Sequence, residues 1–371
     1  MRVTLPKNLL AERIALLERV IPSRSSNPLL TYLGLAAEKD VLVLFGSNGE
    51  VDLEVRLPAQ LEGEGRYLIP SQPFFQLVRS LPGETVELSL GSELALASGR
   101  FTTRLALAPM EGYPELLFPD LEGGEGGFTQ RAQFLAEELQ RALSQVRYAA
   151  SNEEYRAIFR GVQLEFSDRG FRAVASDGYR LALFDLERPQ PFTKKAVVPA
   201  RSVDELVRVL RSAEGEVVLA LGPGTLGLAV RQEEGALRMA VRLMEGEFPE
   251  YERVIPKEFP LKAALDVEPF REALKRVSVL ADKQNHRVDL FLEEGRALLS
   301  AEGDYGKGQE EVSVSLEGAP MSLAYNARYL LEALAPLSGR AELGFSGPTS
   351  PTLVRPLEEG GYQAVVVPLR V

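Results

Sequence analysis

The stretch Phe74-Phe75-Gln76-Leu77-Val78-Arg79-Ser80-Leu81 decides the fold, because its apolar pattern occurs three times in the chain. Its apolar residues stand at i, i+3, i+4 and i+7, a spacing that places them on one face of a short helix. The three sets are Phe74, Leu77, Val78 and Leu81; Val203, Leu206, Val207 and Leu210; and Leu330, Ala333, Leu334 and Leu337. The pattern therefore predicts a chain built from one unit three times.

Other landmarks recur at a similar distance. The strings Asn48-Gly49 and Asp177-Gly178 open alternating runs 129 residues apart, and we expect Gly303, 125 residues further on, to mark the third counterpart. An earlier helix also recurs, and the string Leu-Ala-Glu at 10–12 and 135–137 suggests its alignment. Its apolar sets are Leu10, Ile14 and Leu17; Leu135, Leu139 and Ala142; and Phe270, Leu274 and Val277. A period this long is a domain rather than one turn of a solenoid.

Short runs of alternating apolar and polar residues separate these helices. They include 42–45, 86–90, 217–221, 238–243 and 288–292. Such alternation is typical of half-buried antiparallel sheet. The sequence therefore predicts an α+β fold made of three tandem copies of one helix-and-antiparallel-sheet domain. A glycine-rich segment at 120–127 and a proline-bracketed one at 256–260 place the domains at 1–122, 123–256 and 257–371.

The composition excludes several classes of function. The 371 residues include 42 Lys and Arg against 53 Asp and Glu, so the net charge of −11 disfavours general adhesion to nucleic acid or anionic membrane. Zero cysteines and one histidine argue against disulfides and a zinc site, and we expect no metal and no cofactor. Without a membrane-length apolar run or a signal peptide, we expect a cytoplasmic protein. The absence of Cys and Trp and the 24 prolines suggest a thermophilic source.

No active site stands out. We interpret Asp177-Gly178 as a tight turn, with a catalytic aspartate as the alternative, because the first copy has Asn48-Gly49 at that place. The single histidine, His286, lies in a polar segment that favours a solvated or capping role over catalysis. One rival hypothesis is a metal- or carboxylate-dependent hydrolase, which would need clustered Asp, Glu or His. The other is a scaffold that binds only proteins, whose arginines would be scattered.

Arginines recur on the predicted helices. Arg201 and Arg208 are seven residues apart and share a face opposite the apolar set of their helix, and Arg79 stands at the position equivalent to Arg208. Each helix alone could be an ordinary solvated face. Together, rows of arginine on equivalent helices suggest contacts that follow phosphates without reading bases.

The C-terminal segment Ala364–Val371 is apolar almost to its last residue. We interpret its first half as a final edge strand. The ending Pro368-Leu369-Arg370-Val371 would leave apolar side chains near the surface, and an exposed apolar patch often marks a partner site.

Several strings resemble those of the bacterial sliding clamp family, the beta subunits of DNA polymerase III. The matching strings are Val198–Arg201, Ala175–Ala182, Gly246–Pro256, Tyr325–Tyr329 and Val367–Val371. The resemblance spans the whole chain. It implies three like domains per chain and a head-to-tail homodimeric ring around duplex DNA, with sheets outside and helices lining the hole. It also implies a non-catalytic processivity factor that binds the DNA polymerase III catalytic subunit, the clamp loader and other clamp-binding peptides.

The resemblance also implies site residues. A peptide pocket between the second and third domains would comprise Phe159, Ser176, Gly178, Tyr179, Arg180, Leu181, Pro249, Arg253, Val254, Asn326, Tyr329, Thr349, Pro351, Val365, Val366, Val367, Pro368, Leu369 and Arg370. Tyr179 stands where a relative has His, and Asn285 where an aromatic gate residue is expected. Arg24 would contact DNA, and we add Arg79, Arg147, Tyr148, Arg156 and Arg201 because of the helix faces on which we expect them. Leu77 and Leu105 would meet Val279 and Leu280 across the ring interface.

Overall fold

A computed structural model describes residues 1–123, 127–358 and 360–370 of the chain. Three residues of the predicted linker, 124–126, and the last residue of the C-terminal segment lie outside these ranges. The described part divides into two compact units, Met1–Gln140 with Asp204–Leu243 and Arg141–Val203 with Met244–Val371. The division passes through the middle third of the chain, so each unit holds one end domain and part of the central one.

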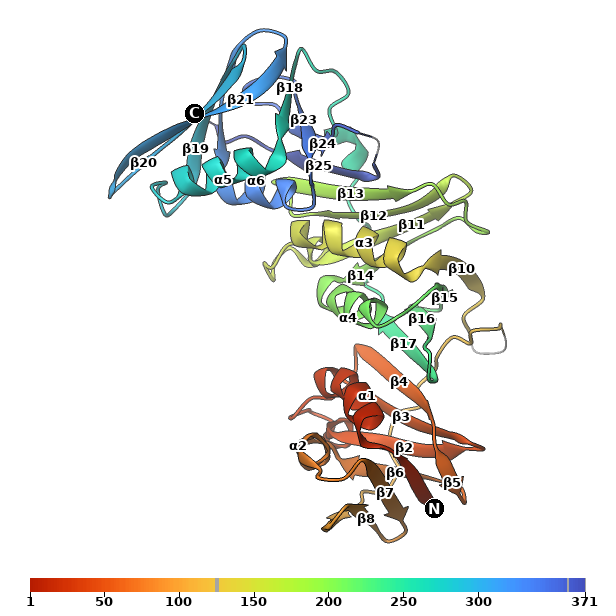
Figure 1. Cartoon of the computed structure of the whole chain (residues 1–371). Coiled ribbons are helices and arrows are strands. Elements are labelled where there is room, and N and C mark those ends of the chain that lie inside the picture. Colours follow the sequence, from red (N-terminus) through yellow and green to blue (C-terminus); the bar gives the residue numbers. More distant parts are fainter. Residues whose placement is uncertain (124–126, 359, 371) are drawn as a thin grey trace. The chain divides into compact units, whose positions relative to one another are not determined.

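Within the described ranges the same order of elements occurs three times (Figure 1). Each third has a strand, a helix, four strands, a second helix and three strands, and the first third adds the short strand β5. The helices are α1 (Lys7–Val20), α2 (Ser71–Ser80), α3 (Ala136–Val146), α4 (Ala200–Arg211), α5 (Val267–Ser278) and α6 (Ala327–Leu334). Short 3-10 turns are η1 (Pro28–Thr31), η2 (Arg147–Ala149), η3 (Ala157–Arg160) and η4 (Tyr251–Val254). The predicted α+β fold of three tandem copies is confirmed.

The first unit contains two antiparallel sheets. The smaller has the strand order β5 (Gln60–Glu62), β1 (Arg2–Pro6), β7 (Thr85–Leu90), β8 (Glu93–Ser98) and β9 (Phe101–Ala106). The larger has the order β10 (Gln130–Leu135), β15 (Glu216–Gly222), β16 (Thr225–Arg231), β17 (Ala236–Arg242), β4 (Val51–Pro58), β3 (Val41–Ser47), β2 (Tyr32–Glu38) and β6 (Gly65–Pro70). The pairing of β17 with β4 joins strands of the central and first domains into one sheet.

The second unit contains an antiparallel sheet of twelve strands. Its order is β14 (Lys194–Pro199), β11 (Gly161–Ser167), β12 (Gly170–Ser176), β13 (Arg180–Leu186), β25 (Tyr362–Val366), β24 (Thr352–Pro356), β23 (Arg340–Phe345), β18 (Leu261–Asp266), β21 (Gly306–Glu317), β20 (Arg296–Gly303), β19 (Arg287–Glu293) and β22 (Met321–Asn326). Here β13 of the central domain pairs with β25, the last strand of the third. Helices α5 and α6 pack side by side (Figure 1).

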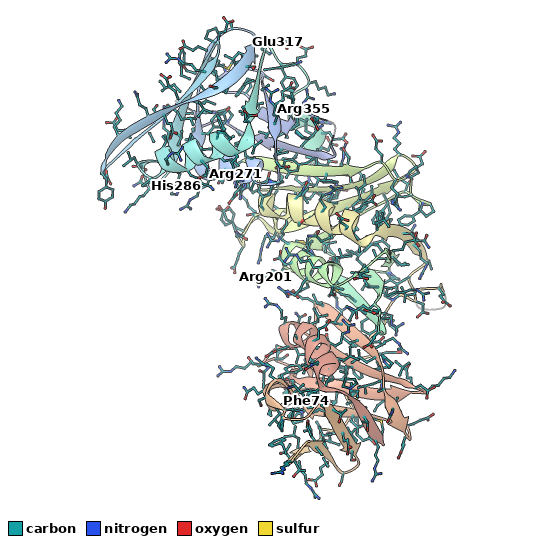
Figure 2. All side chains as sticks on the ribbon, viewed as in Figure 1. Phe74, Arg201, Arg271, His286, Glu317 and Arg355 are labelled. Carbon is teal, nitrogen blue, oxygen red and sulfur yellow. The ribbon has the colours of Figure 1, made fainter. Side chains whose placement is uncertain are left out.

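The first residue of each recurring apolar set is buried in its helix, as the spacing requires. Phe74, Val203 and Leu330 are at most 1% exposed, and Figure 2 labels Phe74. The third copy is shorter than the pattern suggests, because α6 ends at Leu334 and Leu337 follows in a turn. Leu77 is only partly buried and Leu81 lies just past the end of α2.

Two alignments of the repeat were wrong by a few residues. Leu135 is not helical, because it ends β10 and is 41% exposed. The first residues of the three first helices are Lys7, Ala136 and Val267, so Leu10 corresponds to Leu139 and not to Leu135. A chance repeat of Leu-Ala-Glu caused the error.

The third turn is also displaced by one residue. Gly303 pairs with Gly306 around a two-residue turn, so Asp304 and not Gly303 stands at the place of Gly178.

The sequence of strand β4 alternates between apolar and polar residues, but its polar residues are buried as well as its apolar ones. Asp52 and Glu54 on its polar face are 3% and 6% exposed. Because β17 pairs beside it, the Glu54 carboxylate accepts hydrogen bonds from Arg238 Nε at 2.7 Å and Arg238 Nη2 at 2.9 Å. Burying such a charge is tolerable only when it is paired and hydrogen-bonded. The junction between β4 and β17 therefore combines backbone pairing with a buried ion pair.

We expect Glu54→Ala to lower the free energy of unfolding of the first unit by about 1.5–3 kcal/mol, because Arg238 loses its bidentate partner and keeps the Asp120 carboxylate at 2.7 Å. Urea unfolding measures the loss. The matched control is Glu93→Ala, which removes an exposed acid paired with Arg104 at 2.7 Å and should cost less than about 1 kcal/mol. Equal losses for both variants would contradict a structural role for the buried pair.

Candidate functional site

The pairing of β13 with β25 brings the C-terminal segment to the residues expected around it. Arg180 opposes Val366, which in turn opposes Thr352 of β24 on its other side. Beyond β25, the Val367 amide donates to the Tyr179 carbonyl at 3.0 Å and the Leu369 amide donates to the Ala324 carbonyl at 2.7 Å. The last described residues are thus held between the turn before β13 and the strand before α6.

The Asp177-Gly178 turn is structural, as the sequence indicated. Asp177 Oδ1 accepts from the backbone amides of Tyr179 at 2.9 Å and Arg180 at 3.0 Å. Gly178 has a φ of +89°, which favours glycine, and a Cβ there would lie 2.9 Å from Arg156 Nη1. The turn presents Tyr179 with its ring 50% exposed.

Arg180 is the most engaged side chain of the site. Its Nε donates to Asp177 Oδ2 at 3.2 Å and its Nη2 to the Tyr148 carbonyl at 3.1 Å. The guanidinium also contacts the carboxylate of Glu332 on α6 and lies 4.5 Å from the Tyr329 ring centroid. Because two carboxylates and a carbonyl engage its guanidinium and Tyr329 covers one face, Arg180 holds the turn, η2 and α6 together and is not a free cation for a ligand.

The buried Tyr362 and the partly buried Tyr148 lie beneath this network. The hydroxyls of Tyr148 and Tyr362 are 2.7 Å apart, and Tyr362 also donates to the Ala333 carbonyl at 2.6 Å. Burial raises the pKa of Tyr148 and raises that of Tyr362 well above the usual value, so both stay protonated at neutral pH. Burial also raises the pKa of Tyr329, and the nearby Asp177 carboxylate adds to the effect.

The surface open to a ligand is smaller than the expected set. Leu181, Val365 and Val366 are at most 2% exposed, and the first two pack in an apolar cluster with Tyr251. These three side chains therefore offer a ligand little surface, and their place in the pocket stays a prediction. Exposed apolar side chains remain at Tyr155, Tyr179, Val254 and Val367 (78%, 50%, 50% and 36%).

The other expected pocket residues differ in their exposure and in their hydrogen bonds. Asn326 caps α6 by accepting from the Arg328 amide at 3.0 Å, and Ser176 Oγ donates to the Arg180 carbonyl at 2.9 Å. Pro249, Arg253 and Thr349 are exposed, and Arg253 pairs with Glu250 at 2.6 Å. Phe159, Pro351 and Leu369 are partly buried, Pro368 is buried and Arg370 is exposed. Asn285 is exposed and accepts from the Arg287 amide at 3.1 Å.

The resemblance placed Tyr179 and Tyr329 in one pocket but did not predict that their rings stack. Tyr179 stacks on Tyr329 with ring centroids 6.4 Å apart and planes at 21°. Arg156, assigned to DNA, instead lies 5.2 Å from the Tyr179 ring centroid and donates to the Asp177 carbonyl at 2.7 Å. It precedes η3 and is not on a long helix, so its helix-face assignment was wrong. In the sequence, the string Tyr155-Arg156 could have indicated a contact between an arginine and aromatic rings, but its pattern is that of an ordinary polar turn.

The remaining DNA candidates divide into exposed and engaged residues. Arg24 and Arg201 are exposed, and Figure 2 labels Arg201 on α4. Arg79 is 56% exposed at its side chain and contacts the carboxylate of Glu18. Arg147 Nε donates to the Ala200 carbonyl at 2.9 Å, and the hydroxyl of Tyr148 is held by Tyr362. Tyr148 was therefore misplaced by the helix-face argument, because η2 turns its side chain into the protein.

The expected ring residues lie near strand edges. Leu105 is partly buried on β9, the last strand of its sheet. Val279 is 78% exposed after α5, and Leu280 covers Gly308 of β21, where a Cβ would lie 2.7 Å from its Cδ1.

In the part of the chain that the structure describes, no group of three or more His, Asp or Glu side chains is placed to hold a metal ion. No helix of these same residues is both long and apolar enough to cross a bilayer.

Comparison with known proteins identifies relatives over the whole chain. Models of the N-terminal, central and C-terminal domains of the DNA polymerase III beta subunit match residues 1–117, 133–250 and 252–370. Beta sliding clamps of Caulobacter vibrioides and Streptomyces coelicolor are 30% and 32% identical over all of both chains. The solved beta subunit of Thermotoga maritima, 27% identical, superposes with a TM-score of 0.88 and covers 100% of this chain and 99% of that one. A Pseudomonas aeruginosa clamp, 25% identical and covered in full, gives 0.92.

We expect Tyr362→Phe to destabilise the second unit by about 1–3 kcal/mol, because it leaves the buried Tyr148 hydroxyl and Ala333 carbonyl without a partner. Tyr305→Phe, at a ring 79% exposed, is the matched control and should change nothing. The folded-state pKa of Tyr362 lies above the unfolded value of about 10, so its contribution is present below pH ~10 and falls as pH rises further. Urea unfolding from pH 8 to 11 should show a shallower alkaline loss in the variant than in the parent protein; an identical loss would contradict the assignment.

Proposed function

The chain belongs to the family of the DNA polymerase III beta subunit, the bacterial sliding clamps, and we propose which of its surfaces hold partner, DNA and second copy. It is a DNA sliding clamp, a head-to-tail ring of two chains that encircles duplex DNA and tethers the replicative polymerase for processive synthesis. We propose that the clamp is non-catalytic, acts in the cytoplasm, and has domain boundaries near 122 and 256.

The partner surface is the ledge formed by Tyr179, Val254 and Val367, with the Tyr179–Tyr329 stack as its wall. The observation that carries this assignment is that the exposed Tyr179 and Val367 are joined by a backbone hydrogen bond where β25 ends. The exposed Val254 closes the short turn that begins at Tyr251, which packs against Leu181 and Val365 of the same two strands. Burying such side chains contributes roughly 1.5–3 kcal/mol each, less the cost of ordering a peptide. The ledge thus suits a short apolar peptide from the polymerase III catalytic subunit, the clamp loader or another partner.

The solved Caulobacter crescentus clamp, 29% identical with a TM-score of 0.90, carries polyethylene glycol at a region described as its putative beta-motif tethering region. That region of the relative accepts a flexible linear polyether, and we propose that the ledge of this chain accepts a linear peptide.

The DNA surface includes Arg24, Arg79 and Arg201, which are exposed cations on or beside helices. Contacts from arginine to phosphate carry no base information. With a net charge of −11, the chain as a whole repels DNA, so a few local arginines give weak attraction. Retention on DNA therefore rests on the closed ring and not on affinity.

We expect Val367→Glu to weaken binding of a polymerase-derived peptide at least about tenfold, because it places a charge on the apolar ledge without a partner. Fluorescence anisotropy of the labelled peptide measures the affinity. Leu357→Glu is the matched control, since Leu357 is 38% exposed against 36% for Val367 and lies at the opposite end of β24. If both variants bind the peptide like the parent, the ledge is not the docking surface.

Salt and topology should separate the ring from an ordinary DNA binder. Six to ten phosphate contacts lose about 10³–10⁵ in affinity between ~50 and ~200 mM salt. A clamp loaded on a nicked circular plasmid should nevertheless stay bound at high salt and dissociate once a restriction cut provides an end. Gel filtration of the same loaded plasmid before and after the cut makes the comparison. Equal retention on circular and linear DNA would contradict the topological mechanism.

A further inference from the structure

A cavity opens on the first unit where the segment 107–121, here called the first strap, crosses the larger sheet. Met110, Tyr113 and Leu116 of this strap pack against a buried cluster on β2 and β3. The cavity beside them has a volume of about 270 Å³, and its walls include Ala36, Val43, Phe45, Glu54, Arg66 and Leu116. A protein cavity of about 150 Å³ already holds a benzene ring, so this one has room for an aromatic side chain.

The second unit has a counterpart for each of the five sheet residues among these walls, at the separation of 129 residues that relates the two glycine turns. The pairs are Ala36 and Glu165, Val43 and Arg172, Phe45 and Val174, Glu54 and Leu183, and Arg66 and Lys195. Strand pairing agrees with this alignment, because Ala36 lies between Val43 and Arg66 across three strands, and Glu165 lies between their counterparts. The two units therefore have the same surface with different side chains.

A second strap, the segment 243–260, follows β17 as the first strap follows β9. The strings Tyr113-Pro114-Glu115 and Phe248-Pro249-Glu250 align, and the aromatic ring that opens each string packs against the apolar cluster of its own unit. The alignment places Tyr251 of the second strap at the position of Leu116 in the first.

In the second unit Tyr251 fills the place that is hollow in the first. Its ring is 5% exposed and lies in one apolar cluster with Val174 and Leu183. Its hydroxyl donates to the Glu165 carboxylate and accepts from Arg172 Nη1 at 3.2 Å. All four of these residues are counterparts of cavity walls.

The first unit lacks the groups that fill this place and bind the hydroxyl. Leu116 replaces the Tyr251 ring, and Ala36 and Val43 replace the two partners of its hydroxyl. Because Ala36, Val43 and Phe45 are at most 5% exposed, the cavity has an apolar floor. A ring without a hydroxyl suits this floor best, since a buried hydroxyl without a partner is costly.

The cation at the rim is kept, but its carboxylate partner is not. In the second unit Lys195 Nζ lies 3.7 Å from the Glu165 carboxylate. Its counterpart Arg66 is exposed, lies 5.1 Å from the Phe45 ring centroid and has no ion pair within the residues that the structure describes. The other charged walls are paired, Arg238 with Glu54 and Asp120, and Glu38 with Arg56. A carboxylate brought by a ligand can therefore pair with Arg66.

We propose that this cavity, the strap socket, is a second docking site for a protein partner, and that it takes an aromatic side chain with a carboxylate beside it from a peptide segment of that partner. The ring occupies the place that Tyr251 fills in the second unit, and the carboxylate pairs with Arg66. Leu117, which lines the cavity and is 56% exposed, provides apolar contact for the residues beside the ring. The socket belongs to the first unit and the ledge to the second, so the proposal goes beyond the proposed function and stands independently of it.

Ligand-observed saturation-transfer NMR on the full-length protein tests the ring. The probe acetyl-Glu-Phe-Glu-amide should bind with a dissociation constant of about 1 mM, because one ring and one exposed ion pair supply the contact. The probe acetyl-Glu-Ala-Glu-amide, which has no ring, should bind at least about tenfold more weakly. Equal affinities of the two probes, or no binding of either, would overturn the socket.

Leu116→Phe locates the binding site, because it places a ring of the chain itself where the second unit has Tyr251. It should abolish binding of acetyl-Glu-Phe-Glu-amide. The matched control is Leu357→Phe, a partly exposed leucine of the second unit, which should leave the affinity of the probe unchanged. A probe that binds the Leu116→Phe variant as tightly as the parent protein binds elsewhere, and the proposal is then wrong.

Arg66→Gln tests the carboxylate at an exposed position where the fold should tolerate the change. It should weaken acetyl-Glu-Phe-Glu-amide about two- to fivefold, the range of an exposed ion pair, and leave acetyl-Gln-Phe-Gln-amide unchanged. Arg100→Gln, at another exposed arginine of the first unit, controls for the loss of one positive charge. Equal losses for the acidic and the amide probe, or for the two variants, would overturn the pairing with Arg66.

The ledge and the socket are separated by exchanging variants and ligands. Val367→Glu should weaken the polymerase-derived peptide and leave acetyl-Glu-Phe-Glu-amide unaffected, whereas Leu116→Phe should do the reverse. Loss of the probe in the Val367→Glu variant would mean that the probe binds at the ledge, which overturns the socket and leaves the ledge standing.

Discussion

Antiparallel pairing across domain edges is the constraint on which the rest of the structure depends. A strand at the end of a sheet presents unpaired amide and carbonyl groups, which invite pairing with another strand. Each third of this chain ends in such a strand, and each third contains a turn-opened strand able to receive one. Two of these edges are satisfied within the chain, β17 by β4 and β25 by β13. A repeat of this kind has no natural end within one chain, and a second copy is the simplest way to remove the last edges.

The partner ledge arises from the same constraint. Because β25 must end against the turn before β13, the residues that follow it are held beside Tyr179 and the start of α6. The local sequence then decides whether the corner attracts a ligand. The second junction has Tyr179 in its turn and Tyr329 in α6, whereas the corresponding positions of the preceding repeat are Glu50 and Ser202. The second junction thus has an aromatic corner that is open to an apolar peptide. The first junction has polar residues at the corresponding positions.

The sequence was sufficient for the repeat, the fold class and the turn at Asp177-Gly178, because these depend on local periodicity and on glycine at positive φ. It was insufficient wherever a side chain's role depends on what packs beside it. Leu181 and Val365 read as pocket residues but lie in a core, since Tyr251 covers them from a segment about 70 residues from the first. Arg180 was expected at a polar rim, yet its guanidinium is engaged by Asp177, Glu332 and Tyr148 within the protein. The burial of Glu54 likewise depends on Arg238, which no short-range pattern connects to it.

The arginines obey the same logic and explain how a net-acidic protein can work on DNA. Several of those that recur on the helices serve the fold, such as Arg208 with Glu205 and Arg276 with Glu310. Pairing of this kind removes attraction that would otherwise bind phosphate tightly. A clamp must stay on DNA and yet move along it, and strong contacts would resist movement while doing nothing for topological retention. Weak phosphate contacts within a closed ring provide both properties. The ring-closing junction then has to be strong enough to persist and weak enough to open.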